Sequence, residues 1–175
     1  MGHRNGLGEG LITGFDIRPA TDDDWLGLWP IIETVTRAGE TYTYPRDMTE
    51  AAARAMWTPP APGVTLVAVE EGLVLGAAKI VPNQQGNGAH VANGSFMVGP
   101  AARGRGVARR LGEAALEQAR VAGFRSMQFN AVVEANIHAV ALWKSLGFDI
   151  LATVPEAFDH PTHGLVGLHV MYRRL

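Results

Sequence analysis

The chain has 175 residues, 47% of them hydrophobic, and a formal net charge of −2. Such a chain can bury one good core, so a single domain is expected. The lack of a basic surplus argues against nucleic acid or a membrane surface as a partner. The sequence contains no cysteine, which excludes a disulfide framework, a thiol nucleophile and a cysteine-ligated metal.

The chain shows no sign of export or of a membrane span. The first ten residues lack the apolar core of a signal peptide, and the long run without charged residues from 80 to 102 is broken by proline, glycine and amide side chains. We therefore expect a cytoplasmic protein with a flexible N-terminal tail over residues 1–14 and one domain over residues 15–175.

The first elements are marked by proline and by capping residues. Residues 15–18 are predicted to form a strand that Pro19 ends. Thr21, followed by three aspartates, predicts a helix N-terminus, and Pro30 is expected to kink or break that helix. Thr49 is expected to cap a second, short helix. A hairpin over 64–81 with its turn at Glu71-Gly72 then leads through a polar loop to a central strand.

A glycine turn after the central strand is the main functional signal. Gly104 and Gly106 let the backbone bend, and apolar residues recur at helical spacing from Val107 until Gly123 stops the helix. Free N–H groups and the positive end of the helix dipole meet at this turn, so it is expected to bind a phosphate or pyrophosphate.

Two well-known phosphate-binding motifs are excluded here. The dinucleotide fingerprint needs a glycine where the chain has Arg109, and the nucleotide P-loop needs Gly-Lys-Ser/Thr, which is absent. Arg103-Gly-Arg-Gly106 is also compatible with an RGG-like nucleic-acid segment, but such segments are disordered, whereas a helix begins here at once.

The rest of the chain is predicted to continue with a strand over 126–133, a helix over 136–146, a strand over 148–154, a loop over 155–164 and a last strand over 165–173.

Two motifs in this part of the chain resemble the signatures of the GNAT N-acetyltransferases. Arg103-Gly104-Arg105-Gly106-Val107-Ala108 matches the acyl-CoA signature Arg/Gln-x-x-Gly-x-Gly/Ala, and Asn136, Ala139, Trp143 and Gly147-Phe148 match a second one. The resemblance implies an α/β GNAT fold, with a mixed, twisted sheet, splayed central strands and flanking helices. It also implies acetyl-CoA as the cosubstrate and no metal.

The resemblance further implies how acetyl-CoA is bound. The pantetheine arm would enter between the splayed strands like a strand, with the Val98 N–H facing the thioester oxygen. The amides of the glycine turn would take the pyrophosphate. The implied cofactor residues are Met97, Val98, Arg103, Gly104, Arg105, Gly106, Val107, Ala108 and Asn136.

The proton-transfer groups depart from the family pattern. Many members have a tyrosine acid at the position of Trp143, whose indole N–H is a donor only, so we assign Trp143 to packing. The central strand carries no Asp or Glu, which leaves His90 and Glu134 as candidate bases acting through water, with an ordinary role as loop and cap residues as the alternative. His160 and His163 have no third ligand in view, and no metal is predicted there.

A narrower resemblance runs from about Thr41 to the end of the chain and includes Val81-Pro-Asn83, His90-Val-Ala-Asn93 and Phe129-Asn-Ala-Val-Val133. It is to the subfamily that contains the yeast azetidine-2-carboxylate N-acetyltransferases, which acetylate small cyclic imino acids. This implies that Asn93 and Asn130 hold the substrate and act catalytically together with Val98. The implied substrate-binding residues are Asn93, Phe96, Asn130, Ala131 and Tyr44.

Several alternatives stay open at this stage. The two asparagines are also suited to bridge the split between the strands, and Tyr42 and Tyr44 to pin their loop. The acceptor is alternatively phosphinothricin, methionine sulfoximine, a polyamine or a protein N-terminus, and a non-catalytic acyl-CoA sensor is a further option. Dimers are frequent in this fold, so a homodimer is one expected state.

Overall fold

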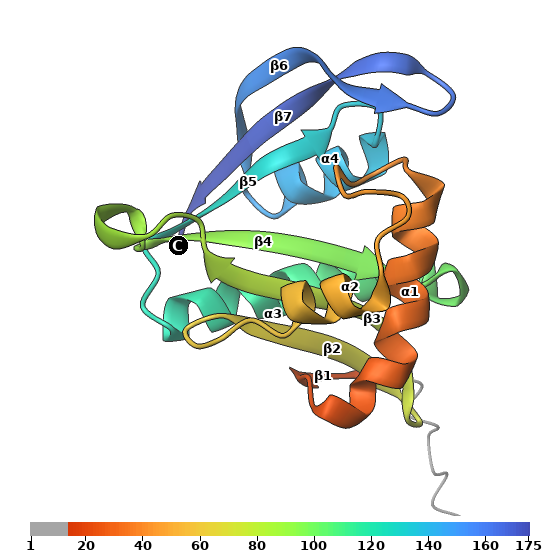
Figure 1. Cartoon of the computed structure of the whole chain (residues 1–175). Coiled ribbons are helices and arrows are strands. Elements are labelled where there is room, and N and C mark those ends of the chain that lie inside the picture. The colour runs from red at the N-terminus through yellow and green to blue at the C-terminus, as the bar shows by residue number, and fades with distance from the viewer. Residues whose placement is uncertain (1–13) are drawn as a thin grey trace, which may run out of the picture.

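The computed structural model describes residues 14–175, which form one seven-stranded sheet with four α-helices (Figure 1). The expected tail, residues 1–14, lies outside this range except for its last residue. The strands are β1 (Asp16–Pro19), β2 (Val64–Glu70), β3 (Leu73–Pro82), β4 (Val91–Val98), β5 (Ser126–Val133), β6 (Asp149–His160) and β7 (Gly164–Arg174). The helices are α1 (Trp25–Ala38), α2 (Glu50–Trp57), α3 (Val107–Val121) and α4 (Ile137–Ser145).

The sheet consists of two antiparallel halves joined by one short parallel contact. Its strand order is β1-β2-β3-β4-β5-β7-β6, and β4 and β5 are its parallel pair. Their register covers only Val91 with Ser126, Ala92 with Met127 and Asn93 with Gln128. Beyond Asn93 the two strands diverge, and Figure 1 shows them close together at one end and far apart at the other. The splayed central strands expected from the sequence are therefore present.

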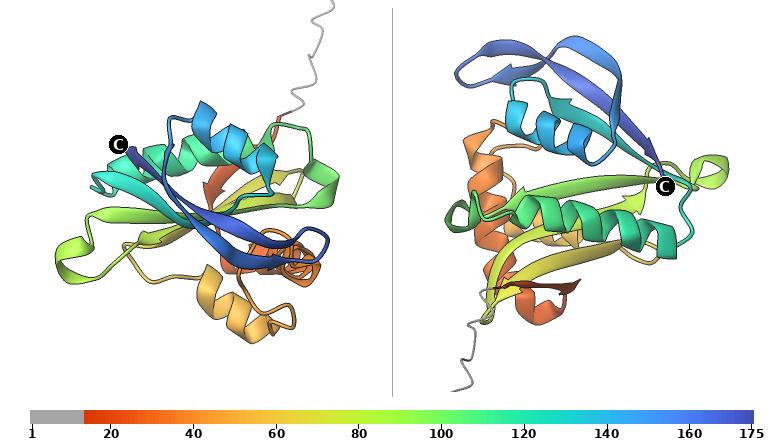
Figure 2. Two further views of the ribbon diagram at one scale, coloured as in Figure 1. Left: turned by 90° about the horizontal axis from the view of Figure 1, so that it is seen from above. Right: turned by 180° about the vertical axis from the view of Figure 1, so that it is seen from behind.

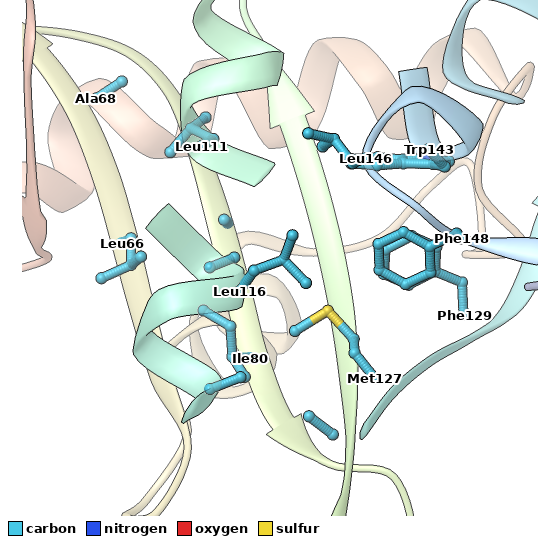
Figure 3. Close-up of a cluster of buried hydrophobic side chains, with 14 of the residues drawn as sticks. Leu66, Ala68, Ile80, Leu111, Leu116, Met127, Phe129, Trp143, Leu146 and Phe148 are labelled. Atoms are coloured by element: carbon cyan, nitrogen blue, oxygen red, sulfur yellow. The ribbon is translucent and has the colours of Figure 1, made fainter. Parts of the chain in front are cut away.

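Helices cover both faces of the sheet. In Figure 2, α3 lies along one face, and α1 and α2 lie on the other. The apolar stripe of α3, including Leu111 and Leu116, packs on Leu66, Ile80 and Met127 (Figure 3). Burial of such a stripe is what fixes an amphipathic helix to a sheet. The helix thus covers the sheet beside β4, and the edge of β4 toward β5 is left without a strand partner beyond Asn93.

Trp57 lies at the centre of the second core, between α1, α2 and the sheet. Its side chain is fully buried beside Ile32, Val67 and Met97. Thr49 caps α2 by accepting a hydrogen bond from the Ala52 N–H (3.3 Å), as predicted. This packing holds the α1–α2 loop against the face of the sheet.

The structure overturns two sequence expectations about local structure, namely a helix break at Pro30 and a loop over 155–164. Pro30 does not break α1, because Pro30 is exposed and the carbonyl that it leaves unpaired belongs to Leu26, which is 84% exposed and open to water. The predicted loop over 155–164 is mostly strand, because β6 continues to His160. A register shift between Val154 and Phe158 accommodates Pro155 in a bulge, where no ladder donor is needed.

None of the helices in the described part of the chain is long and apolar enough to cross a membrane.

Candidate active site

A cleft of about 980 Å³ opens where β4 and β5 diverge. It is lined by the α1–α2 loop, the two strands, the turn before α3 and the start of α4. The predicted site residues that line it are Tyr44, Asn93, Phe96, Met97, Val98, Arg103, Gly104, Gly106, Val107, Ala108, Asn130, Ala131 and Asn136. Residues that are far apart in the sequence thus converge on one cavity.

Arg105 is the predicted site residue whose side chain lies elsewhere. Its Nη2 donates to both carboxylate oxygens of Glu70, at 2.7 and 2.8 Å. The guanidinium is thus directed toward the β2–β3 hairpin, and only the main chain of Arg105 is left for the cleft.

The turn before α3 has the geometry of an anion site. Gly104 and Gly106 adopt φ of +74° and +76°, which glycine tolerates best, and a Cβ on either would meet nothing within 4 Å. The Arg110 N–H donates to the Gly106 carbonyl (3.1 Å) and closes the first helical turn. The N–H groups of Val107 and Ala108 precede that bond and are left free by helix geometry, so they point out of the N-terminus together with the helix dipole.

The edge of β4 that faces the cleft presents main-chain groups. The Tyr42 hydroxyl accepts from the Phe96 N–H (2.7 Å) and donates to the Phe96 carbonyl (2.6 Å), so these groups point away from β3. Residues two apart on a strand direct their main-chain groups to the same edge. The Val98 N–H and carbonyl therefore also point into the cleft.

A cluster of carboxamides closes the narrow end of the cleft. Asn83 Oδ1 accepts from Asn93 Nδ2 (3.1 Å) and from Asn130 Nδ2 (2.7 Å), while Gln128 Nε2 donates to Asn130 Oδ1 (2.9 Å). Asn83 therefore ties β4 to β5 where they begin to separate. Sequence reasoning assigned no role to Asn83, although it lies within the Val81-Pro-Asn83 motif.

Aromatic side chains form one wall of the cleft. Phe96 packs against Trp143 with ring centroids 4.6 Å apart, and Trp143 packs against Phe129 at 4.9 Å. Phe129 in turn stacks on Phe148 at 4.3 Å. The Trp143 side chain is only 7% exposed, which agrees with a packing role.

The titratable groups of the cleft differ from those expected. His90 and Glu134 do not line it, and Glu134 Oε2 instead accepts from the Gly167 N–H on β7 (2.9 Å). Glu40 and His138 do line it, although no sequence motif singled them out.

The two cleft tyrosines are protonated at neutral pH. Burial raises the pKa of the Tyr42 phenol well above its usual value, with nearby Tyr44 adding to the effect. Burial also raises the pKa of Tyr44, although the Ser95 side chain acts in the opposite direction. Neither phenol is therefore a base at neutral pH.

The chain is similar to several known proteins. A GCN5-related N-acetyltransferase from Kribbella flavida is 52% identical, with a TM-score of 0.90 over 93% of this chain and 98% of that chain. The N-acetyltransferase aca1 of Schizosaccharomyces pombe is 37% identical over 101 residues, which are 57% of this chain and 48% of that protein, so the match spans about half of its length. A phosphinothricin acetyltransferase from Sinorhizobium meliloti, in complex with AcCoA, shares the fold at 22% identity (TM-score 0.83, 92% of this chain and 88% of that chain).

The sequence model of the acetyltransferase (GNAT) family matches residues 29–148, which include the whole of β4, the glycine turn, α3, β5 and α4. The match therefore covers the strand edge and the turn that shape the cleft. The chain belongs to the GNAT acetyltransferase family.

Proposed function

We propose that this protein transfers the acetyl group of acetyl-CoA to the amine of a small amino or imino acid of the azetidine-2-carboxylate type. The observation that carries the proposal is that the anion site, the open edge of β4 and the carboxamide cluster share one cleft. These three features lie in the order in which a pyrophosphate, a peptide-like arm and a small polar acceptor would need them.

The residues around the glycine turn fit the phosphate end of acetyl-CoA. The N–H groups over 104–108 and the Arg103 side chain would hold the pyrophosphate, since Gly104 and Gly106 have no side chain and open space beside them, which allows close approach. The main chain of Val98 would bind the pantetheine, whereas the main-chain groups of Met97 point toward β3, so Met97 would only line the cleft beside the arm. Asn136 caps α4 through its Oδ1, which accepts from the Ala139 N–H (3.3 Å), and this leaves its Nδ2 for the arm.

The chemistry requires an activated acyl group, which acetyl-CoA supplies as a thioester. The Val98 N–H would stabilise negative charge on the carbonyl oxygen during attack by the amine. The N-terminus of α4, at Asn136, would favour the leaving thiolate, whose ordinary pKa of about 8.5 makes an acid from Trp143 unnecessary. Glu40 and His138, which bring a carboxyl group and an imidazole to the cleft lining, would take the amine proton through water.

The acceptor end is built from neutral groups. Asn93 and Asn130 each use one N–H of the carboxamide on Asn83 and keep the other N–H for a ligand. With the main chain of Ala131, they would bind the carboxylate of the acceptor. Phe96 and Tyr44 would enclose its apolar ring.

The proposal is tested by measuring thiol release from acetyl-CoA with a panel of amines. The panel contains azetidine-2-carboxylate, proline analogues, methionine sulfoximine, phosphinothricin, spermidine and a short peptide. Turnover confined to the imino acids supports the proposal. Turnover confined to another amine of the panel would identify a different acceptor and contradict the proposed class of imino-acid substrates. Binding of acetyl-CoA without turnover would favour an acyl-CoA sensor.

A further inference from the structure

The hydroxyl of Tyr42 makes an unusual contact with the edge of β4. It bonds both main-chain groups of one residue, accepting from the Phe96 N–H at 2.7 Å and donating to the Phe96 carbonyl at 2.6 Å. The two residues are 54 positions apart in the sequence. The Tyr42 ring stacks on Tyr44 with centroids 5.0 Å apart, which holds the hydroxyl in place.

This contact interrupts an otherwise open strand edge. Unpaired N–H and carbonyl groups at an edge accept an added strand or a peptide-like arm. At Phe96 both groups are already used by Tyr42, whereas those of Val98, two residues closer to the glycine turn, face the cleft. An arm that enters from the turn can therefore add to β4 at Val98 but not at Phe96.

Toward the point where the strands meet, the cleft is lined by Asn93 and Asn130 of the carboxamide cluster. Asn83 bridges Asn93 and Asn130 at the point where the strands meet. The part of β4 between that bridge and Phe96 spans three residue steps, about 10 Å at the rise of a strand. That length suits a small acceptor and leaves little room for a long acyl chain beside it.

We propose that Tyr42 is a positioning residue that divides the cleft, stopping the acyl-CoA arm at Val98 and restricting the acyl group to a short chain. The inference rests on the proposed use of acetyl-CoA. It adds a residue that determines acyl-chain length, and it reserves the segment from Asn93 to Phe96 for the acceptor.

The test compares the binding of acetyl-CoA and hexanoyl-CoA to wild type and to Tyr42→Phe. The substitution removes both hydrogen bonds that anchor the ring to β4, so only the stacking on Tyr44 holds the ring at the edge and a longer acyl chain can displace it. We expect the affinity for hexanoyl-CoA relative to acetyl-CoA to rise about tenfold, the scale set by one or two lost hydrogen bonds. Tyr172→Phe, on β7 and outside the cleft lining, is the matched control and should leave the ratio unchanged.

The acyl-CoA ratio is the readout that a merely structural tyrosine would not move, and amide hydrogen exchange at Phe96 reports separately whether the hydrogen bond to Tyr42 forms in solution. In wild type this amide should be protected, and in Tyr42→Phe it should exchange much faster while the neighbouring Met97 amide, which points toward β3, stays protected. An unprotected Phe96 amide in wild type, or an unchanged acyl-CoA ratio in the variant, would overturn the proposal.

Neither readout needs turnover of an acceptor. Failure of every amine in the panel would therefore count against the proposed substrate and leave the assignment of Tyr42 to be decided by these measurements. If wild type bound no acyl-CoA at all, both proposals would fall.

Discussion

At the scale of single residues, the acceptor end of the cleft depends on Asn83. Its Oδ1 accepts one N–H from each of two carboxamides that lie on different strands. A single acceptor oxygen thereby fixes which way Asn93 and Asn130 present their remaining donors. Asn83 is half-buried and lies just after β3, at the start of the loop over 83–90. It therefore orients two side chains of the pocket although it does not belong to β4 or β5, the strands that carry them.

We predict that Asn83→Ala raises the KM for the acceptor about tenfold and leaves the Kd for acetyl-CoA unchanged, since the Asn93 and Asn130 carboxamides lose hydrogen bonds that orient them, each worth about 1 kcal/mol. Asn83→Asp keeps an acceptor oxygen but brings a negative charge near the carboxylate of the substrate, and should also raise the acceptor KM. Steady-state kinetics and calorimetry measure the two effects separately. Asn87→Ala, an exposed change in the same loop, is the control. Equal losses of acceptor and acetyl-CoA affinity would indicate that Asn83 only holds the two strands together.

At the scale of elements, the glycine turn and α3 act as one unit. The turn brings free N–H groups to the cleft, and the buried stripe of α3 fixes their direction. Glycines with positive φ stand near both ends of the helix, Gly106 at +76° and Gly123 at +85°, and a Cβ on either meets nothing within 4 Å. They therefore provide equivalent backbone positions, of which only Gly106 lies at the cleft.

This pair allows the anion site to be tested without confusion from backbone strain. Gly106→Trp should abolish the stabilisation by acetyl-CoA, because the indole would fill the site where the pyrophosphate binds. Gly123→Trp imposes a similar left-handed strain, about 1–2 kcal/mol, and should lower the melting temperature by a similar amount while acetyl-CoA still raises it. Thermal unfolding with and without acetyl-CoA measures both. Retention of the acetyl-CoA effect in Gly106→Trp would contradict the assignment of the pyrophosphate to this turn.

The sequence predicted the elements that are determined by residues close together in the chain, and it missed those that depend on contacts between distant residues. The turn, α3, β5 and α4 are coded by residues close together in the chain, so their glycines, caps and apolar spacing identified them. The bulge that carries β6 past Pro155 is decided by pairing with β7, which no local pattern reveals. In the cleft, the contacts from Tyr42 to Phe96 and from Asn83 to Asn130 join residues 54 and 47 positions apart. Short sequence motifs do not predict contacts between residues so far apart.

At the scale of the whole molecule, the sheet is open at its centre, and its stability must come from each half. In the half that begins with β1, a buried carboxylate adds to the apolar packing of α1 by linking β1 to the start of that helix. Asp24, 8% exposed, accepts from two guanidinium nitrogens of Arg18 at 2.7 and 2.8 Å and from the Thr21 N–H at 2.7 Å. The hydrogen bonds from Arg18, against the opposing effect of burial, lower the pKa of Asp24 to about 2, and those from Thr21 add to this.

The depressed pKa predicts an acid-sensitive contribution to the free energy of unfolding. Because the carboxyl group holds its proton less tightly in the folded state, the contribution is complete above its unfolded pKa of about 4 and is lost as the pH falls toward about 2. Arg18 is 43% exposed, so solvent screening reduces the contribution to about 1–2 kcal/mol.

The free energies of unfolding in urea of wild type and Asp24→Asn should therefore differ by that amount at neutral pH, and the difference should shrink steadily below about pH 4. Asp23→Asn, an exposed change one residue earlier, should show the same dependence of the free energy of unfolding on pH as wild type. A difference between wild type and Asp24→Asn that stayed constant down to about pH 2 would mean that Asp24 stabilises the fold through its shape and hydrogen bonds rather than through its charge.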